Sequence, residues 1–198
     1  MPVKRRCAWG EGSPLMCDYH DTEWGFPVAD DTRLFEKICL EGFQSGLSWR
    51  TVLDKRDDFR RVFHGFDLER VARMGRRDVT RLLGDASIIR HRGKIESTIA
   101  NAGRCADLIA EHGSLGRYVW GFEPARRRRP PSARDVARLA TSPESVALSK
   151  DLKRRGWSFV GPTTMYAFMQ SMGLVNDHHA GCDVWTYAET ARSRLRIR

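Results

Sequence analysis

The sequence lacks the features that mark membrane and secreted proteins. None of its 198 residues belongs to an apolar run long enough to cross a lipid bilayer. No apolar signal segment follows the basic start, which reads Met1-Pro2-Val3-Lys4-Arg5-Arg6. These two absences favour a cytoplasmic protein with no membrane partner.

Cysteines are few and show no pairing rhythm. There are five, an odd number, at positions 7, 17, 39, 105 and 182. In a reducing compartment this distribution favours free thiols or metal ligands over a disulfide framework.

Acidic side chains are outnumbered by basic ones. The chain has 34 Lys and Arg against 25 Asp and Glu, which gives a formal net charge of +9. An excess of this size favours a polyanionic partner such as nucleic acid. Part of the excess stands in the run Arg126–Arg129 and in the tail after Arg192, and such runs are commonly solvated faces.

No stretch alternates apolar and polar residues for long enough to predict a strand. Apolar residues instead recur every three or four positions, with capping residues at the ends, and we expect an all-α fold. The expected helices fall within 30–42, 67–74, 78–83, 95–113, 142–156 and 162–173. Residues 114–141 contain Arg-rich and Pro-rich sequence and indicate a loop or loosely ordered connector. The length suits one domain over 1–198, ending in a basic tail at 186–198.

The segment 176–182, written NDHHAGC, contains side chains that commonly bind zinc. His178 and Cys182 are four residues apart and can reach one ion, with His179 as a rival ligand. A tetrahedral site needs two more ligands, and the N-terminal segment offers three candidates: Cys7, His20 and Cys17. From the residues alone, a zinc site and a set of core histidines and thiols remain alternatives.

Five blocks of the sequence resemble, in the same order, the bacterial 3-methyladenine DNA glycosylase I family. They are Cys7-x-Trp9 with Tyr19-His20-Asp21-x-Glu23-Trp24-Gly25, Leu40-Glu41-Gly42-x-Gln44-x-Gly46-Leu47-Ser48-Trp49, Ile88-Ile89-Arg90-His91-Arg92-Gly93-Lys94-Ile95, Phe159-Val160-Gly161-x-Thr163-Thr164 with Phe168-Met169-Gln170, and Leu174-Val175-Asn176-Asp177-His178-x-x-Gly181-Cys182. The blocks span residues 7–182 and leave the connector and the tail unmatched.

The resemblance implies a helix-hairpin-helix DNA repair fold that contains one structural zinc ion. The implied ligands are Cys7, His20, His178 and Cys182, which join the two ends of the chain. Four protein ligands leave no open position for an activated water, so this ion would act as a clip. The implied partner is double-stranded DNA that contains alkylated adenine, bound by a monomer and placing the protein at the nucleoid.

The implied activity is removal of N3-methyladenine by hydrolysis of its N-glycosidic bond. The enzyme has to turn the nucleotide out of the duplex into a pocket. Methylation gives the base a positive charge and weakens its bond to the sugar, so the pocket must supply aromatic faces and a hydrogen-bond acceptor. By resemblance Glu41 contacts the base, although its spacing also suits a structural acid paired with an arginine. Tyr19 would give its hydroxyl to the base edge, or else pack beside the zinc.

Three tryptophans fall in the matched blocks and are the candidates for the pocket walls. We expect Trp9 and Trp49 to stack on the base and Trp24 to support them. Met16 stands where many family members carry tyrosine, which removes one hydroxyl from the expected pocket. The remaining tryptophans, Trp120, Trp157 and Trp185, are expected in the core or on the surface.

Other residues are candidates for contact with DNA. Gly46 and Leu47 resemble the family's plug, which fills the gap left by the flipped base. Glycines and cations around the turn at 156–162, and in the 88–95 block, suit contact with phosphates: Gly156, Gly161, Thr163, Lys153, Arg155, Arg90, Arg92 and Lys94. Asn176 stands where many hairpin glycosylases carry a catalytic Asp, and no lysine matches a Schiff-base position. We therefore expect base release without strand cleavage.

Two other functions fit the same residues. One is a zinc-stapled module that recognises DNA lesions or ends without cutting, and the other is a glycosylase of altered lesion range, suggested by Met16. Glu41 beside three tryptophans favours a glycosylase, because a protein that only binds the DNA backbone needs no such cavity.

Overall fold

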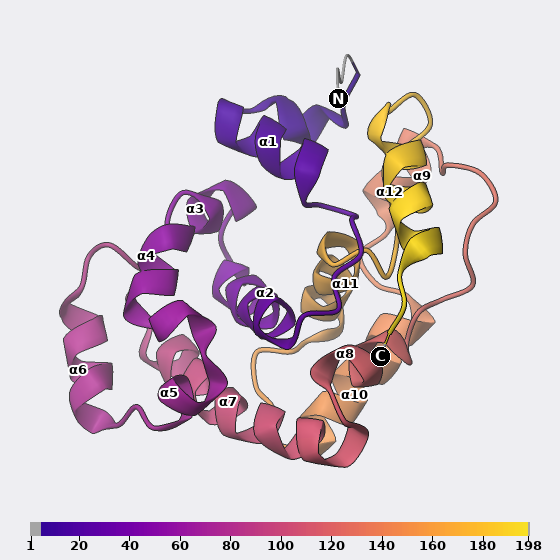
Figure 1. Cartoon of the computed structure of the whole chain (residues 1–198). Coiled ribbons are helices and arrows are strands. Elements are labelled where there is room, and N and C mark those ends of the chain that lie inside the picture. Colours follow the sequence, from indigo (N-terminus) through magenta and orange to yellow (C-terminus); the bar gives the residue numbers. More distant parts are fainter. Residues whose placement is uncertain (1–4, 198) are drawn as a thin grey trace.

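A computed structural model of the chain describes residues 5–197, and its secondary structure is helical (Figure 1). Within these residues there is no strand, so the predicted all-α class is confirmed. None of the helices described is long and apolar enough to cross a membrane.

Helix α2 (Asp31–Gln44) runs through the centre of the fold (Figure 1). The side chain of Asp30 accepts a hydrogen bond from the backbone N–H of Arg33 and caps the helix. Every residue from 34 to 43 is buried, polar ones included. A helix that is surrounded on all sides can carry a charged side chain into the interior, and Glu41 is placed in this way.

The chain after α2 forms a lobe of short helices: α3 (Trp49–Leu53), α4 (Arg56–Val62), η2 (His64–Phe66), α5 (Leu68–Ala72) and α6 (Arg76–Gly84). Phenylalanines from α2, α4 and η2 stack in its core, with the rings of Phe43 and Phe59 4.5 Å apart. The long helix α7 (Arg92–His112) packs against α5 and α2. It ends at Gly113, whose φ of 84° suits a glycine at a helix C-terminus.

On the other side of α2 lie α8 (Leu115–Trp120), α10 (Pro143–Arg154) and α11 (Pro162–Ser171). Ser142 caps α10 and Pro143 begins it, as predicted. Helix α11 packs against both α10 and α2.

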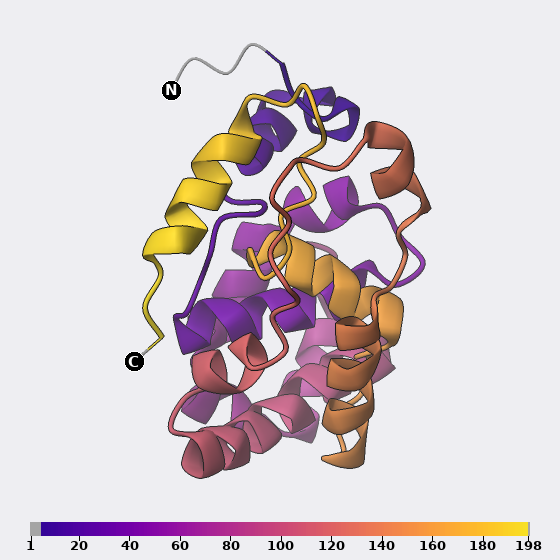
Figure 2. The same cartoon turned by 90° about the vertical axis from the view of Figure 1, so that its right-hand side faces the viewer.

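The prediction of a loose connector at 114–141 is wrong for its first part. Helix α8 buries most of its residues, and the indole N–H of Trp120 donates to the carbonyl oxygen of Val28 at 2.8 Å. Only the later part of the connector runs over the surface, where it contains a six-residue helix, α9 (Ala133–Arg138), with no buried residue (Figure 2).

The two ends of the described chain meet. The N-terminal elements η1 (Ala8–Glu11) and α1 (Pro14–Thr22) lie near the start of α12 (Val184–Arg194), and Asp183 accepts from the backbone N–H of Arg5. Most of the expected basic tail is helical, because α12 reaches Arg194. Arg192 is buried and donates to Glu189 and Glu123. Residues 1–4 of the predicted basic start, and Arg198, lie outside the described residues.

Candidate active site and metal-binding cluster

A cavity of about 240 Å³ opens where α1, α2, α3 and α11 converge. Its volume is smaller than the roughly 300–1,000 Å³ typical of sites for drug-sized ligands, and it suits a single nucleobase. Most of the lining side chains are aromatic or able to hydrogen-bond: Trp9, Tyr19, Trp24, Glu41, Gln44, Trp49, Val136, Ala167 and Gln170.

Glu41 is the buried acid of this cavity, with only 5% of its surface exposed. Burial raises the pKa of its carboxyl from 4.5 to about 7, while the nearby Lys37 ammonium and Ser171 favour the charged form. Within the described residues no arginine forms an ion pair with it, since the nearby Arg56 and Arg60 bind other carboxylates. The alternative of a structural Glu–Arg pair is therefore not what the structure contains.

Lys37 is a residue of this site that the sequence analysis missed. It is buried, and its Nζ donates to the hydroxyl oxygen of Tyr19 at 2.9 Å. The same Nζ lies 4.1 Å from the ring centre of Trp49. Lys37 stands three residues after Leu34 and four before Glu41, so its position on the apolar arc of the helix could have identified it.

Tyr19 acquires a defined hydrogen-bonding role from Lys37. An ammonium group only donates, so the Tyr19 oxygen is the acceptor and its own proton is available to another group. Burial raises the pKa of Tyr19 well above 10, which keeps that proton in place. Burial also lowers the pKa of Lys37 to about 8.

The three predicted tryptophans all line the cavity. Trp9 is 38% exposed and contacts Trp24 edge to face, with ring centres 4.9 Å apart. The ring of Trp49 lies 5.2 Å from that of Tyr19 on another wall. The cavity therefore presents several aromatic faces and one acid, as the sequence analysis expected.

A groove of about 260 Å³ adjoins the cavity and shares Glu41 and Gln44 with it. The loop after α2 lines the groove with Gly46, whose φ of 82° favours glycine, and with Leu47, which is 43% exposed. Thr163, near the start of α11, lines the same groove. Three residues predicted to contact DNA are thus brought together beside Glu41.

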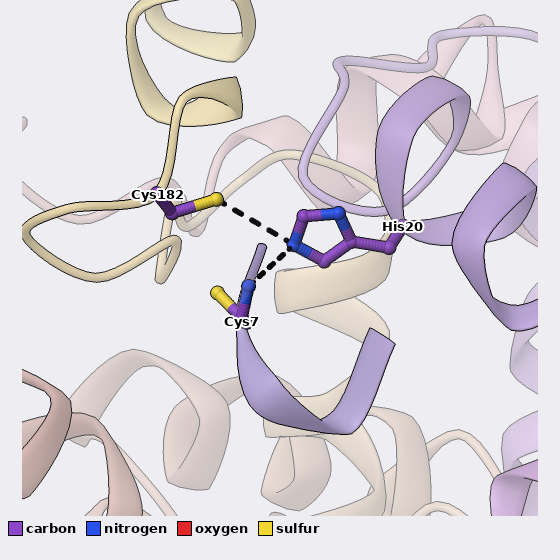
Figure 3. A group of neighbouring side chains, drawn as sticks. All are labelled: Cys7, His20 and Cys182. Carbon is purple, nitrogen blue, oxygen red and sulfur yellow. Dashed lines mark hydrogen bonds between the residues drawn. The ribbon is translucent and has the colours of Figure 1, made fainter. Parts of the chain in front are cut away.

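Side chains from both ends of the chain form a second cluster, beside the cavity. Cys7, His20 and Cys182 are buried, and their ligand atoms all lie within 4.8 Å of one another (Figure 3). The His20 Nε2 lies 3.6 Å from the Cys182 sulfur. The interaction between the two thiols raises the pKa of Cys7 and lowers that of Cys182. Such a set of thiol and imidazole groups is the kind that zinc binds.

The other ring nitrogen of His20 is bound to a carboxylate. Its Nδ1 lies 2.7 Å from Asp21, and Arg6 holds the same carboxylate through two nitrogens. Since the carboxylate accepts, Nδ1 carries the proton, and Nε2 accepts from the backbone N–H of Cys7 at 3.2 Å (Figure 3). A carboxylate behind a ligating histidine is a common arrangement in metal sites.

His178 lies beside this cluster and is not one of the residues whose ligand atoms lie within 4.8 Å of one another. Its ring centre is 4.9 Å from that of His20, and its Nδ1 lies 2.9 Å from the Asn176 side-chain oxygen. The Asn176 amide nitrogen donates to the Trp185 carbonyl, which fixes the oxygen toward His178. The His178 Nε2 is therefore unprotonated, and it is buried without a hydrogen-bond partner.

The two rival ligands are less suitable. His179 is partly exposed and its Nδ1 lies 2.9 Å from the carbonyl oxygen of Ala180. Cys17 is partly exposed and does not belong to the cluster. The structure thus brings together three of the four predicted metal-binding residues and leaves the fourth, His178, with an unused nitrogen.

Comparisons with known proteins agree with this geometry. The family model described as methyladenine glycosylase matches residues 9–186. DNA-3-methyladenine glycosylase 1 of Escherichia coli strain K12 is 48% identical over 181 residues, which are 89% of this chain and 95% of that protein. DNA-3-methyladenine glycosylase of Haemophilus influenzae is 44% identical, over 89% of this chain and 96% of that protein.

Solved structures give the same result. A crystal structure of 3-methyladenine DNA glycosylase I is 48% identical and has a TM-score of 0.84, covering 90% of this chain and 98% of that one. The enzyme from Staphylococcus aureus, whose structure concerns the recognition of 3-methyladenine, is 32% identical with a TM-score of 0.84, covering 90% and 95%. The chain belongs to the methyladenine glycosylase family.

Some residues of this methyladenine glycosylase lie elsewhere than expected. Met16 does not line the cavity but is buried behind its wall, against Tyr19, Trp24 and Leu53. Its thioether therefore supports the aromatic residues instead of facing a base. The missing tyrosine hydroxyl is thus less important for the pocket than the sequence suggested.

Two cationic side chains that were predicted to contact DNA bind other groups of the protein instead. Lys94 is buried and donates to the carbonyl oxygens of Phe43 and Ser45, at 2.8 and 2.6 Å. Arg155 binds the carboxylates of Glu111 and Asp151. Lys94 thus satisfies carbonyl groups at the end of α2, which would otherwise lack donors, and holds the start of the Gly46 loop.

The other predicted DNA contacts are on the surface of this methyladenine glycosylase. Arg90, Arg92 and Lys153 are exposed. Gly156, in the turn between α10 and α11, has a φ of 84°, and a Cβ there would come within 2.7 Å of the Arg104 side chain. Gly161 precedes the first turn of α11, where free N–H groups point outward.

Proposed function

We propose that this chain turns 3-methyladenine out of duplex DNA and hydrolyses its N-glycosidic bond. It is a DNA glycosylase of the methyladenine family, and its work is DNA repair. The observation that carries the proposal is the cavity, in which an acid with a pKa raised to about 7 lies among three indole side chains. Binding to the DNA backbone alone needs no such cavity.

The cavity suits a methylated adenine because that base is a cation in the nucleotide. Indole and phenol faces attract a cationic ring, and the Glu41 carboxylate offers it a compensating charge. Adenine presents an N–H donor at N6 and an acceptor at N7. Glu41 can accept from the first, and Tyr19 can donate its free proton to the second. Guanine presents acceptors at both positions, so the pair favours adenine.

The reaction needs little further chemistry from the protein. The methylated base leaves as a neutral molecule, so no proton donor has to act on it, and the Glu41 carboxylate would hold the flipped cation in the cavity through its amino group. Asp177 is not an open general base, because Arg127, Tyr166 and Gln170 occupy its carboxylate. The Nζ of Lys37, the lysine beside the cavity, is bound to the Tyr19 hydroxyl, and we propose base release without strand cleavage.

Duplex DNA would lie across the groove beside the cavity. Leu47 is exposed at its edge and would fill the gap that the flipped nucleotide leaves. Helices α10 and α11 with their glycine turn would act as a helix-hairpin-helix element, with Lys153 and the N-terminus of α11 toward phosphates. One chain supplies all of these surfaces, so we propose a monomer that acts on DNA in the cytoplasm.

We propose that the second cluster holds one structural zinc ion, bound by Cys7, His20, Cys182 and His178. The unpartnered Nε2 of His178, buried beside three converging ligands, supports this set. The ion would join the segment that carries Trp9 and Tyr19 to the segment before α12. Asp21 and Asn176 would orient the two imidazoles.

The test is to incubate the protein with DNA methylated by a simple alkylating agent and to identify the released bases by chromatography. We expect free 3-methyladenine and an intact strand that carries an abasic site, with no adduct trapped by borohydride. Binding without base release would instead support the non-catalytic module. A released base other than 3-methyladenine would support an altered lesion range.

A further inference from the structure

Gln170 connects the base cavity to a buried polar network. It lines the cavity from α11, and its Nε2 donates to the Asp177 Oδ2 at 2.8 Å. The Tyr166 hydroxyl donates to the same oxygen at 2.7 Å, and Arg127 forms an ion pair with Oδ1. The Asp177 side chain is completely buried.

This network fixes which end of the Gln170 amide faces the cavity. A carboxylate bound to an arginine accepts hydrogen bonds and does not donate them. If the amide were reversed, its oxygen would face the Asp177 carboxylate, and a buried hydrogen bond would be replaced by a contact between two acceptors. The NH₂ group therefore points to Asp177, and Oε1 is left for the cavity.

The amino group of adenine has two N–H bonds, so it can bind two acceptors of the cavity. Glu41 is suited to accept one of them. Glu41 and Gln170 line the same cavity from α2 and α11, two helices that pack against each other. A fixed amide oxygen there would accept from the second N–H.

We propose that Gln170 is a specificity-determining residue, whose Oε1 accepts a hydrogen bond from the exocyclic amino group of the flipped base. Asp177 is the positioning residue that fixes the amide. A guanine would place its own carbonyl oxygen opposite Oε1, where two acceptors repel. This inference rests on the proposed function. It adds a second hydrogen-bond acceptor for the amino group of the base, beside Glu41.

The experiment compares two free bases that differ only in that amino group: 3-methyladenine and 3-methylpurine. Their binding to the wild-type chain and to Gln170→Leu is followed by tryptophan fluorescence. Loss of one hydrogen bond between uncharged groups should weaken the binding of 3-methyladenine about fivefold. Binding of 3-methylpurine should change less than about twofold, since it has no amino group to lose. Equal weakening of both bases, or no weakening, would overturn the proposal.

Gln170→Met serves as a second variant with an unbranched side chain, and the same change in the ratio of affinities is expected. Asp177→Asn, with its zinc content checked, should also lower the preference for 3-methyladenine, because the amide is then free to reverse. An unchanged ratio in that variant would contradict the positioning role. If the wild-type chain releases 3-methyladenine from DNA but Gln170→Leu keeps the full preference, only this inference fails. If the wild-type chain releases none, the proposed function itself fails.

Discussion

Replacing Glu41 by glutamine should slow the release of 3-methyladenine and remove its dependence on pH. Burial raises the pKa of Glu41 from 4.5 to about 7. At 1.36 kcal/mol for each pKa unit, a charged Glu41 in the empty cavity costs about 3 kcal/mol. A cationic base offsets this cost because it brings a positive charge and N–H donors to the carboxylate.

The direction of the pH effect follows from this linkage. The bound cation favours the ionised carboxylate, so binding lowers the pKa of Glu41 below its value in the free protein. For the wild-type chain, kcat/KM should therefore be constant above pH 7 and fall about tenfold for each unit below it. The scan should end near pH 7.5, because the pKa of the neighbouring Lys37 is about 8.

Glu41→Gln keeps the shape of the side chain but loses its charge. Loss of a hydrogen bond to a charged group costs about 1.5–3 kcal/mol, which is about 10- to 150-fold, and we expect kcat/KM to fall by that factor at pH 7.5. Because glutamine does not titrate, the remaining activity should be constant from pH 5 to 7.5. Single-turnover release of radiolabelled 3-methyladenine measures both quantities.

Glu36→Gln is the matched control. Glu36 is another buried acid of α2, but it binds Arg60 and does not line the cavity. This variant should keep the decline in activity below pH 7. The reasoning is refuted if Glu41→Gln retains nearly full activity, or if the decline disappears in the control instead.

Three further predictions concern the rest of the fold. In His178→Ala, metal analysis should no longer find the single zinc ion, and the Tm should fall. His179→Ala should keep the zinc content and the Tm of the wild-type chain. Zinc at full occupancy in His178→Ala would exclude His178 as a ligand. Lys94→Met removes the donor from two carbonyl groups and should lower the free energy of unfolding by about 1–3 kcal/mol in urea titrations. Excision from duplex DNA should then fall while binding of free 3-methyladenine persists, and equal loss of both would count against a role in holding the Gly46 loop. Arg192→Met removes a buried guanidinium that binds Glu123, Glu189 and the Leu174 carbonyl oxygen, and it should destabilise the chain by about 1–3 kcal/mol. The exposed Arg196→Met should change stability by less than about 0.5 kcal/mol, and similar values for both would show that Arg192 is not structural.

The helices were predictable because their signals are local. Asp30 and Ser142 cap α2 and α10 through side-chain hydrogen bonds to residues three positions away. Gly113 ends α7 with a positive φ. Each signal depends on neighbours in the sequence, so the sequence suffices to find it.

Helix α8 was not predictable in the same way. Its six residues are too few to show a period, and the Arg-rich and Pro-rich sequence that follows gave the whole connector the composition of a loop. What stabilises α8 is burial against distant parts of the chain, such as the bond from Trp120 to Val28. That contact spans more than ninety residues and leaves no local pattern.

In the candidate site, too, some residues have a local sequence signal and others depend on contacts between distant parts of the chain. The predicted metal ligands come from opposite ends of the chain, so spacing alone left alternative ligand sets, and the family resemblance implied one of them. Lys94 and Arg155 were assigned to DNA from their charge, but partners distant in the sequence hold them inside the protein. Lys37 was overlooked because a lysine on an apolar arc is rare, although its spacing from Glu41 places both on one face.

The most direct test of the cavity is a titration of the protein with free bases, followed by the fluorescence of the tryptophans that line it. The account predicts a saturable change with one equivalent of 3,9-dimethyladeninium, which keeps the positive charge that the methylated base has in the nucleotide, much weaker binding of neutral 9-methyladenine, and loss of the difference in Glu41→Gln. A wild-type chain that binds 9-methyladenine as tightly as the cation, or binds neither, would contradict it.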